Sequence, residues 1–379
     1  MTDDQPAGEG RDTFTPDTSI LVTTFRRPRH LALVLESIAL QRRVPRDFEV
    51  VVADDGSGDE TPAVVAAFAA QADFPVRFTT QPHEGFRLAL ARNNAARLAR
   101  GRYLMFLDGD CILPRGHLAA HRERRRRGLA LLGHCARLPE ETSRLLVPEN
   151  LSLTNLGRLI PASEARSLAR RHRRSRWHSL IRHPSKPRLT GGDFGVWRDD
   201  FERVNGFDER FVGWGQEDDD LGLRLRAAGV ALESVLDLTC SLHVWHPTDP
   251  TATPRWRDGA NVAYFSRRGR LTACRAGLHP RHRADILWGL PADLEASPLG
   301  RAVAAALADA PRAASGGTCE IEIVIWPTRG GFSRPAECRL LLVPRGLTPP
   351  RRLADRADRV VAVDARDPEA VAEALEQIG

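Results

Sequence analysis

The sequence predicts an α/β fold whose central sheet is mostly parallel and carries helices on both faces. Short apolar runs alternate with helical stretches over residues 18–114, a pattern typical of repeated βαβ units. Two of these apolar runs end in acidic clusters. The chain has 379 residues, of which 42% are hydrophobic, enough to build the core of one large domain or two modest ones.

The apolar runs also indicate the order of the elements. We expect strand 19–23, helix 28–40, strand 48–53, helix 61–70, strand 76–79, helix 89–99 and strand 103–107. Ligands of mostly parallel sheets lie beyond the carboxyl ends of the strands. The second strand is followed by Asp54-Asp55-Gly56-Ser57 and the fourth by Asp108-Gly109-Asp110, so both acidic clusters are expected at that edge.

The rest of the chain falls into three parts. Residues 1–17 are polar and acidic, which indicates a disordered lead and neither a signal peptide nor a lipidation site. Residues 115–284 are expected to complete the same domain, beginning with an irregular, Arg-rich stretch that has helical pieces. Residues 285–379 predict a small C-terminal α/β module of unknown role. Its expected elements are strands 320–326, 339–343 and 359–363 and a helix over 368–378.

The formal charge of +6 comes almost entirely from arginine, because Lys186 is the only lysine. A GC-rich genome, which favours arginine codons, accounts for most of this bias. The runs 122–127 and 170–176 are nevertheless dense enough to attract phosphates, anionic lipid headgroups or an acidic acceptor. Charge alone does not choose among these partners.

Cysteine usage and hydropathy indicate a cytoplasmic protein. The six cysteines are scattered without a CxxC pair, which suits reduced thiols. No apolar stretch has the length of a membrane span, so we expect at most peripheral membrane contact.

The acidic clusters suggest a metal site. A hard divalent cation binds carboxylate oxygens, and one or two carboxylates together with phosphate oxygens suit Mg²⁺ or Mn²⁺. Asp108 and Asp110 supply two carboxylates, and the intervening Gly109 lets the backbone approach a ligand closely. Such a triplet on its own could equally cap a helix or face water.

Four segments together make a stronger case. A Thr-rich loop at 23–28, the turn at 54–57, the Gly-x-x-x-Ala-Arg-Asn-like helix at 85–93 and the Asp-x-Asp at 108–110 follow one another in the chain. In this order they resemble the family 2 glycosyltransferases, whose nucleotide-binding half has the GT-A fold. The resemblance covers roughly residues 19–114 and makes residues 18–114 the expected nucleotide-sugar-binding half.

The resemblance implies roles for individual residues. The loop and the turn would contact base and ribose, the helix would pass the diphosphate, Asp108 would face ribose or sugar, and Asp110 would bind the metal. Guanidinium groups match phosphate oxygens well, although Arg92 could equally be a surface arginine of a helix. The donor-binding residues implied in this way are Thr23, Arg27, Asp54, Asp55, Arg87, Arg92 and Asp108.

A second motif lies in the other half. Residues 213–220, Gly-Trp-Gly-Gln-Glu-Asp-Asp-Asp, are similar to the Trp-Gly-Gly-Glu-Asp acceptor motif of β-1,4-galactosyltransferases, with Gln216 in place of the second glycine. The resemblance implies Asp218 as general base, Glu217 as the residue that orients hydroxyls, and Trp214 stacking on a sugar. It places Gly192, Asp193, Trp214 and Asp219 on the acceptor side. The alternative is a helix start whose acids complement the helix dipole.

A histidine after the last strand of the domain completes the metal shell in the families that this sequence resembles. His243 fits the spacing best, and His246 is the alternative. Imidazole beside carboxylate favours Mn²⁺ over Mg²⁺.

We therefore expect a metal-dependent, inverting glycosyltransferase that uses a nucleotide diphosphate sugar. A UDP-sugar is the donor that the resemblance favours, with GDP- and dTDP-sugars as alternatives, and the acceptor could be a polysaccharide, glycolipid, peptide or secondary metabolite. A catalytically inactive glycan- or nucleotide-sugar-binding protein is the competing hypothesis. A nucleic-acid-binding protein is disfavoured because the arginine runs lack interleaved aromatics apart from Trp177. A nucleotidyltransferase would carry a Gly-rich loop and a lysine after the first strand, which this chain lacks. Sugar, acceptor and oligomeric state stay open.

Overall fold

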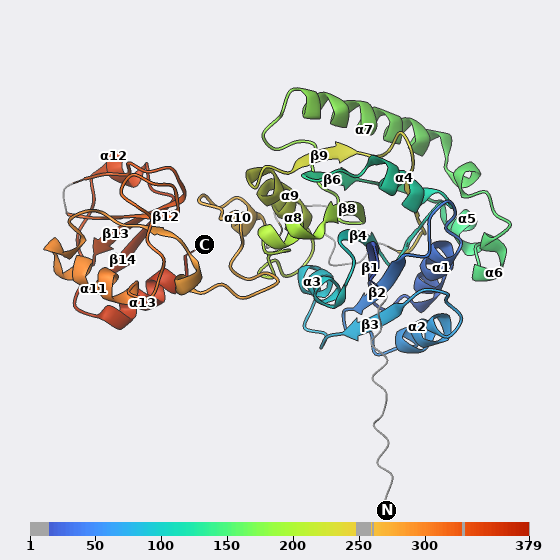
Figure 1. The fold of residues 1–379 in the computed structure, drawn as a ribbon, viewed down its shortest axis with the longest axis horizontal. Coiled ribbons are helices and arrows are strands. Elements are labelled where there is room, and N and C mark those ends of the chain that lie inside the picture. The colour runs from blue at the N-terminus through green and yellow to red at the C-terminus, as the bar shows by residue number, and fades with distance from the viewer. Residues whose placement is uncertain (1–14, 248–258, 260, 328–329, 379) are drawn as a thin grey trace, which may run out of the picture.

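The computed structural model describes residues 15–247, 259, 261–327 and 330–378. Figure 1 shows a larger body built around a twisted sheet and a smaller C-terminal body at one end of the molecule. Among the described residues, none of the helices combines the length and apolar character needed to cross a bilayer.

The larger body contains a seven-stranded sheet with the strand order β3-β2-β1-β4-β8-β6-β9. Strands β1 to β4 are parallel to one another, and β8 runs antiparallel to both β4 and β6. The sheet is therefore mostly parallel, which confirms the predicted fold class. The strands are β1 (Thr18–Thr24), β2 (Phe48–Asp54), β3 (Val76–Thr80), β4 (Tyr103–Asp108), β6 (Leu129–Leu132), β8 (Asp193–Trp197) and β9 (Ala231–Ser234).

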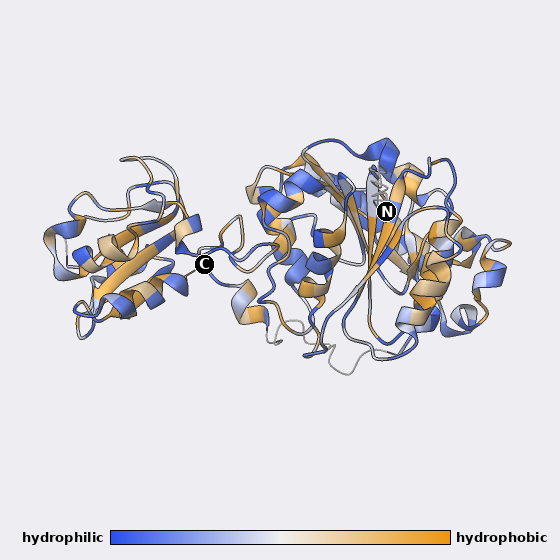
Figure 2. Cartoon of the chain, turned by 60° about the horizontal axis from the view of Figure 1, so that its bottom comes forward, coloured by the Kyte–Doolittle hydropathy of each residue, from blue (hydrophilic) through white to orange (hydrophobic). Residues whose placement is uncertain are grey.

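Helices cover both faces of this sheet because alternate strand residues point to opposite sides. Ile20 and Val22 of β1 face a core that includes α1, whereas Leu21 faces a second core that includes α3 and α9. Figure 2 shows the hydrophobic strands enclosed by helices whose outer surfaces are hydrophilic. The helices of the larger body outside the 115–190 segment are α1 (Pro28–Ala39), α2 (Thr61–Ala69), α3 (Leu88–Leu98), α8 (Arg198–Arg203) and α9 (Glu217–Ala227).

The Arg-rich middle is more ordered than the sequence indicated. It contributes β6 to the main sheet and β7 to a small sheet with the order β5-β10-β7. These strands have three or four residues between polar segments, too few for a periodicity to show. The elements of this region are β5 (Cys111–Ile112), α4 (His117–Arg124), β7 (Cys135–Arg137), α5 (Glu140–Arg144), α6 (Pro148–Leu151), η1 (Leu156–Leu159) and α7 (Ala162–Leu180), and β10 is Ser241–His243.

The predicted end of the disordered lead at residue 17 is wrong. Asp17 is buried, and its carboxylate pairs with Arg125 at 2.6 Å and Arg122 at 3.1 Å. Three ion-pairing arginines, Arg102 included, hold this acid against the start of β1. The prediction for residues 1–14 lies outside the described residues.

The C-terminal body has its own parallel four-stranded sheet, β11-β12-β13-β14, and its own hydrophobic core. Its central strands β12 and β13 are largely buried and mostly apolar, although each also contains charged residues, such as Glu322 and Arg339. Its elements are η2 (Arg283–Asp285), β11 (Trp288–Gly289), η3 (Leu294–Ala296), α11 (Pro298–Ala306), β12 (Cys319–Ile325), β13 (Ala336–Pro344), α12 (Arg351–Ala354), β14 (Arg359–Val363) and α13 (Pro368–Glu376). The short helix α10 (Asn261–Phe265) precedes this body in the chain and packs against the larger one, where Asn261 donates to the carbonyl oxygen of Gly215.

Candidate functional site

Two adjoining hollows lie beyond the carboxyl ends of β1 and β4. The larger, of about 690 Å³, is bordered by the loops after these strands and by the segment after β10, and the smaller, of about 420 Å³, by the start of α9. Both are lined by Asp108, Gly192 and Trp214, so the two predicted motifs meet in one cleft. Asp110 lines the larger hollow and Asp218 the smaller one.

Arg92 joins the two halves of the cleft. Its guanidinium, only 2% exposed, donates to Asp108 Oδ1 at 3.0 Å and to Glu217 Oε1 at 3.2 Å. Its carbon Cζ lies 5.2 Å from the centroid of the Phe207 ring. Arg92 is therefore a buried bridge between the Asp-x-Asp and the acceptor motif, which rules out the surface-helix alternative.

Glycines make this bridge possible. A Cβ on Gly191 would lie 2.4 Å from Arg92 Nη2, and one on Gly192 would lie 2.9 Å from Asp108 Oδ2. Both distances are shorter than van der Waals contact, so side chains here would push the ion pair aside. The backbone N–H of Gly191 also donates to Asp218 Oδ2 at 2.8 Å, which ties the same loop to α9.

The acids at the start of α9 differ in environment. Burial and the neighbouring Asp218 raise the pKa of Glu217 to about 7, although Arg92 acts against this. Burial and Asp218 likewise raise the pKa of Asp219 to about 6. The second oxygen of Glu217, Oε2, is buried without a hydrogen-bond partner within the described structure.

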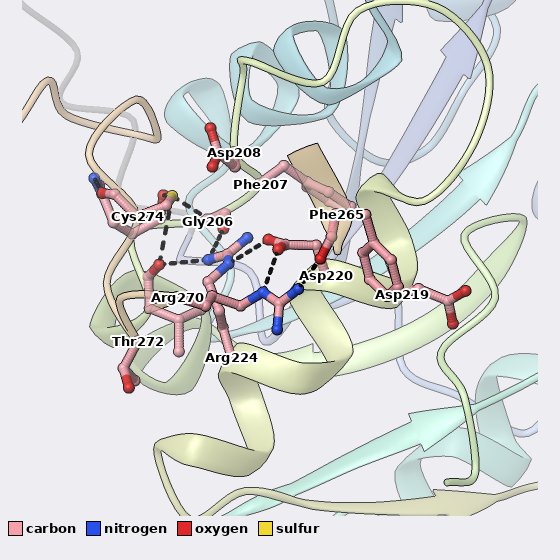
Figure 3. A network of polar contacts seen from close by, with 12 residues as sticks. Gly206, Phe207, Asp208, Asp219, Asp220, Arg224, Phe265, Arg270, Thr272 and Cys274 are labelled. Atoms are coloured by element: carbon pink, nitrogen blue, oxygen red, sulfur yellow. Dashed lines mark hydrogen bonds and ion pairs between the residues drawn. The ribbon is translucent and has the colours of Figure 1, made fainter. Parts of the chain in front are cut away.

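The fourth acid of the run, Asp220, points away from the cleft. Figure 3 shows its carboxylate between Arg224 and Arg270, at 2.6 and 2.8 Å. Arg224 also donates to the carbonyl oxygens of Val204 and Gly206. Burial would raise the pKa of Asp220, but the arginines around it lower it. Asp220 thus anchors α9, and only the first three acids face the cleft.

The predicted metal ligands come together. Asp110 Oδ1 lies 3.7 Å from His243 Nε2, and Asp110 Oδ2 lies 3.2 Å from His246 Nε2. The structure therefore brings both histidines to Asp110, where the sequence analysis preferred one of them. Burial would raise the pKa of Asp110, but His246, His243 and Arg27 lower it. One carboxylate and two imidazoles whose ligand atoms lie within 4.8 Å of one another could hold a divalent metal ion.

Arg27, expected at the nucleoside, contacts this same group. Its Nη1 lies 2.8 Å from Asp110 Oδ2, and the side chain is 31% exposed. The structure thus places Arg27 at the acidic end of the cleft, beside the carboxylate predicted to bind the metal.

The nucleoside end contains fewer of the predicted residues than expected. Thr23 and Asp55 line the larger hollow, and Asp55 accepts hydrogen bonds from Gln81 Nε2 at 2.6 Å and from the backbone of Arg87 at 3.1 Å. The carboxylate of Asp54, in contrast, accepts hydrogen bonds from Ser57 and from Thr80 on β3 and lines neither hollow. Asp54 is buried, and its contacts shape the turn itself.

The side chain of Arg87 also differs from the expectation. It pairs with Glu84 at 2.5 Å and is absent from the lining of both hollows. Of the two arginines predicted beside the diphosphate, only Arg92 lines the cleft.

Asp193 lines the larger hollow and not the smaller one that Asp218 lines. It is 1% exposed and accepts hydrogen bonds from Ser241 Oγ at 2.8 Å and His117 Nε2 at 3.2 Å. Burial would raise its pKa, but His117, His121 and Ser241 lower it to about 2. Asp193 ties β8 to α4 and β10, because its carboxylate accepts hydrogen bonds from protein groups. Its contact with an acceptor stays a prediction.

Several lining residues were missed by the sequence analysis. Phe25 comes from the loop after β1, and the others come from β7, its flanks and the end of β10, segments with no motif of their own. The pairing of β10 between β5 and β7 brings the residues of these strands and their flanks to the cleft. Among the missed residues are Phe25, His134, Cys135, Arg137, Leu138 and Trp245.

Fold and site together define an α/β domain with an acidic, arginine-bridged cleft at the carboxyl edge of its mostly parallel sheet. Residues 19–135 match the family model described as glycosyl transferase family 2, and residues 172–246 match the model described as the N-terminal domain of galactosyltransferase. Both predicted resemblances are confirmed, because each of the two segments matches a model of the kind that its motifs resemble.

Curated relatives carry related names. The validoxylamine A glucosyltransferase of Streptomyces hygroscopicus subsp. limoneus is 33% identical over 247 residues, which cover 59% of this chain and 51% of that protein. The chondroitin synthase of Escherichia coli is 27% identical over 232 residues, 57% of this chain and 33% of that one. The chain thus spans about half the length, or less, of these relatives.

Among solved structures, the mannosyltransferase PcManGT of Pyrobaculum calidifontis has 21% sequence identity and a TM-score of 0.44. The similarity covers 62% of this chain and 59% of that one. A similarity this low supports no conclusion about the site.

Proposed function

We propose that this chain is a metal-dependent glycosyltransferase that moves a sugar from a nucleotide diphosphate sugar to an acceptor hydroxyl with inversion. The observation that carries the proposal is the Asp108–Arg92–Glu217 bridge, because it joins the Asp-x-Asp segment directly to the start of α9, as a shared site for donor and acceptor would require. A UDP-sugar is the proposed donor. The names of the curated relatives support a carbohydrate-type acceptor, and a cytoplasmic location stays a prediction.

The donor would lie in the larger hollow. Thr23 and Asp55, which line this hollow, would contact the nucleoside, and Arg27, which pairs with Asp110, would contact a phosphate oxygen. Asp110, His243 and His246 would hold the metal, which would neutralise the charge that develops on the leaving diphosphate. This donor set of one carboxylate and two imidazoles favours Mn²⁺ over Mg²⁺.

The acceptor would lie in the smaller hollow. Trp214 is 48% exposed and borders both hollows, as required for a ring that stacks on a sugar. Asp218 faces the hollow on the first turn of α9 and is the proposed general base, which takes the proton of the acceptor hydroxyl opposite the leaving group. Glu217, held by Arg92, would orient hydroxyl groups through its unpartnered oxygen.

The proposal is tested by donor hydrolysis. UDP-, GDP- and dTDP-sugars are incubated with the protein and Mn²⁺, and release of the nucleotide is measured with and without EDTA. We expect release from one nucleotide class, abolished by EDTA and restored by Mn²⁺. Binding of a nucleotide sugar without any turnover, with or without metal, would favour the competing hypothesis of an inactive binding protein.

The role of Asp218 is tested separately with Asp218→Asn. We expect kcat for transfer to fall by about 10²–10⁴-fold, because loss of a general base has effects of this size, while the KM for the donor stays similar. The matched control is Asp199→Asn, an exposed acid at the start of α8. An Asp218→Asn enzyme with normal kcat would assign the base to another residue.

A further inference from the structure

The two arginine runs of the sequence differ in the folded protein. In the first run, at 122–127, every arginine has a carboxylate partner. The ion pairs are Arg122 with Asp17 and Asp47, Arg124 with Glu233 and Asp237, Arg125 with Asp17, Arg126 with Glu233, and Arg127 with Asp199. This run is therefore neutralised within the protein and has little charge left for a ligand.

The second run, at 170–176 on α7, is not neutralised. None of its five arginines has a carboxylate within 4.0 Å in the part of the chain that the structure describes. Burial together with Arg174 and Arg137 lowers the pKa of Arg171, and Glu164 only partly offsets this, as expected where positive charges are crowded.

Three of these arginines lie on one face of α7 and line a pocket. Residues spaced three and four apart lie on the same side of a helix. Ser167, Arg170, Arg171, Arg174, Ser175 and His178 follow that spacing and line a hollow of about 330 Å³. Lys186 and Arg188 close it from the loop before β8, and its lining contains no carboxylate.

The pocket also contains an unused hydrogen-bonding group. Ser175 is only 6% exposed, and its Oγ has no partner within the described structure. A buried hydroxyl without a partner costs free energy unless a ligand satisfies it. Arginines around a hydroxyl are the groups that recognise phosphate oxygens.

The pocket adjoins the acceptor side of the candidate site. Arg188 lines both this pocket and the smaller hollow with Asp218, and Thr190 lines both this pocket and the larger hollow. We propose that the pocket binds a phosphate or diphosphate group of the acceptor, so that the acceptor is an anionic, phosphorylated compound. The identification of the phosphorylated compound as the acceptor rests on the proposed function. The phosphate site itself rests only on the residues that line the pocket.

Two double variants provide the test. Arg171→Gln with Arg174→Gln removes two charges from the pocket. Arg173→Gln with Arg176→Gln removes two charges from the same run of α7 at exposed positions that do not line the pocket. None of the four arginines has an ion-pair partner in the described structure, so we expect both variants to melt at the temperature of the wild type.

Binding is measured with two phosphate sources, in EDTA so that no divalent ion assists the donor cleft. Inorganic pyrophosphate represents a soluble phosphorylated acceptor, and phosphatidylglycerol vesicles, compared with phosphatidylcholine vesicles, represent a lipid headgroup. We expect the pocket variant to bind at least one of the two about tenfold more weakly, because charge-assisted hydrogen bonds to phosphate are lost. The control variant should keep the wild-type affinity, and the source that discriminates identifies the kind of acceptor.

Equal loss in both variants would show only a diffuse charge effect, and it would overturn the proposal. Equal binding by all three proteins, or no binding by the wild type in either arm, would overturn it as well. Donor hydrolysis with Mn²⁺ does not use this pocket and should be unchanged in both variants. Failure of hydrolysis in the wild type would therefore contradict the proposed function and leave the result for the phosphate site intact.

Discussion

At the scale of single residues, charge compensation decides the geometry of the cleft. Arg92 faces Asp108 and Glu217 in a nearly solvent-free position, where neither carboxylate has another guanidinium within 4.0 Å among the described residues. Buried charges are tolerated only when they are paired, so the bridge holds two loops at a constant separation. This pairing links stability to function, because the same carboxylates border the space for donor and acceptor.

Arg92→Met should destabilise the protein. The substitution keeps an apolar stem but leaves Glu217 and Asp108 uncompensated, and we expect a loss of about 3 kcal/mol in the free energy of unfolding. Urea denaturation measures this, with Arg87→Met as the control for loss of an exposed ion pair, expected within about 0.5 kcal/mol. Equal stability of Arg92→Met and the wild type would show that the bridge is not formed in solution.

Glu217 should make activity depend on pH near neutrality. Its pKa is raised to about 7, so the carboxylate is ionised above that value and protonated below it. Protonation removes the charge that pairs with Arg92, and we therefore expect kcat/KM to fall as the pH decreases through about 7. Glu217→Gln should lower activity at every pH and remove this inflection. An unchanged inflection in the Gln variant would assign it to another group.

At the scale of elements, short strands outside the main motif region complete the site. β10 lies between β5 and β7, and its end brings His243 next to Asp110. Asp193 supports this arrangement from below, because it links β8 to Ser241 of β10 and His117 of α4. The wall of the cleft therefore depends on a buried carboxylate whose hydrogen bonds come from protein groups.

Asp193→Asn should lower stability in a pH-dependent way. The pKa of Asp193 is lowered from 3.8 to about 2, so its ionised form stabilises the folded state above pH 3.8, and this contribution disappears as the pH falls towards 2. We expect the variant to lose about 2 kcal/mol at pH 7 and to approach the wild type in acid. Urea denaturation at several pH values measures this. A raised acceptor KM with unchanged stability would support the predicted acceptor contact of Asp193.

At the scale of the whole molecule, the segment that contains Leu271 and Arg275, called the linker here, joins the two bodies. Arg275, 6% exposed, donates to the carbonyl oxygens of Leu375 at 3.2 Å and Ile378 at 2.7 Å, and it pairs with Glu376. Carbonyl groups at a helix end have no partners within the helix, so this arginine satisfies the end of α13. Leu271, close by in the linker, packs into the core of the C-terminal body.

Arg275→Ala should lower the stability of the C-terminal body and leave the structure of the cleft unchanged. We expect faster amide exchange in α13 and a loss of about 1–2 kcal/mol in the stability of that body, since buried carbonyl groups lose their donors. Arg352→Ala, exposed at α12, is the control. Hydrogen exchange and donor hydrolysis are measured together, and a fall in hydrolysis would show that the C-terminal body supports the active site.

The sequence by itself determined the fold class, most of the strands and helices, and the edge of the sheet where the site lies. Those features follow from local patterns. Apolar runs predict the strands, and acids that follow such a run are predicted to lie at the carboxyl edge of the sheet. The resemblance to family 2 glycosyltransferases rested on the same local segments, such as the one that contains Asp110. The order of neighbouring residues along the chain was sufficient for these conclusions.

Only the tertiary structure decided which polar groups pair with one another. Arg92 and Glu217 are 125 positions apart, so no local pattern indicates their contact. No local pattern indicates that the carboxylate of Asp193 accepts hydrogen bonds from α4 and β10. Nor does one indicate that, within the described residues, the arginines of one run pair with carboxylates while those of the other run do not. Burial and pairing depend on neighbours brought together by folding, because the energy of a charge is set by its surroundings and not by its place in the chain.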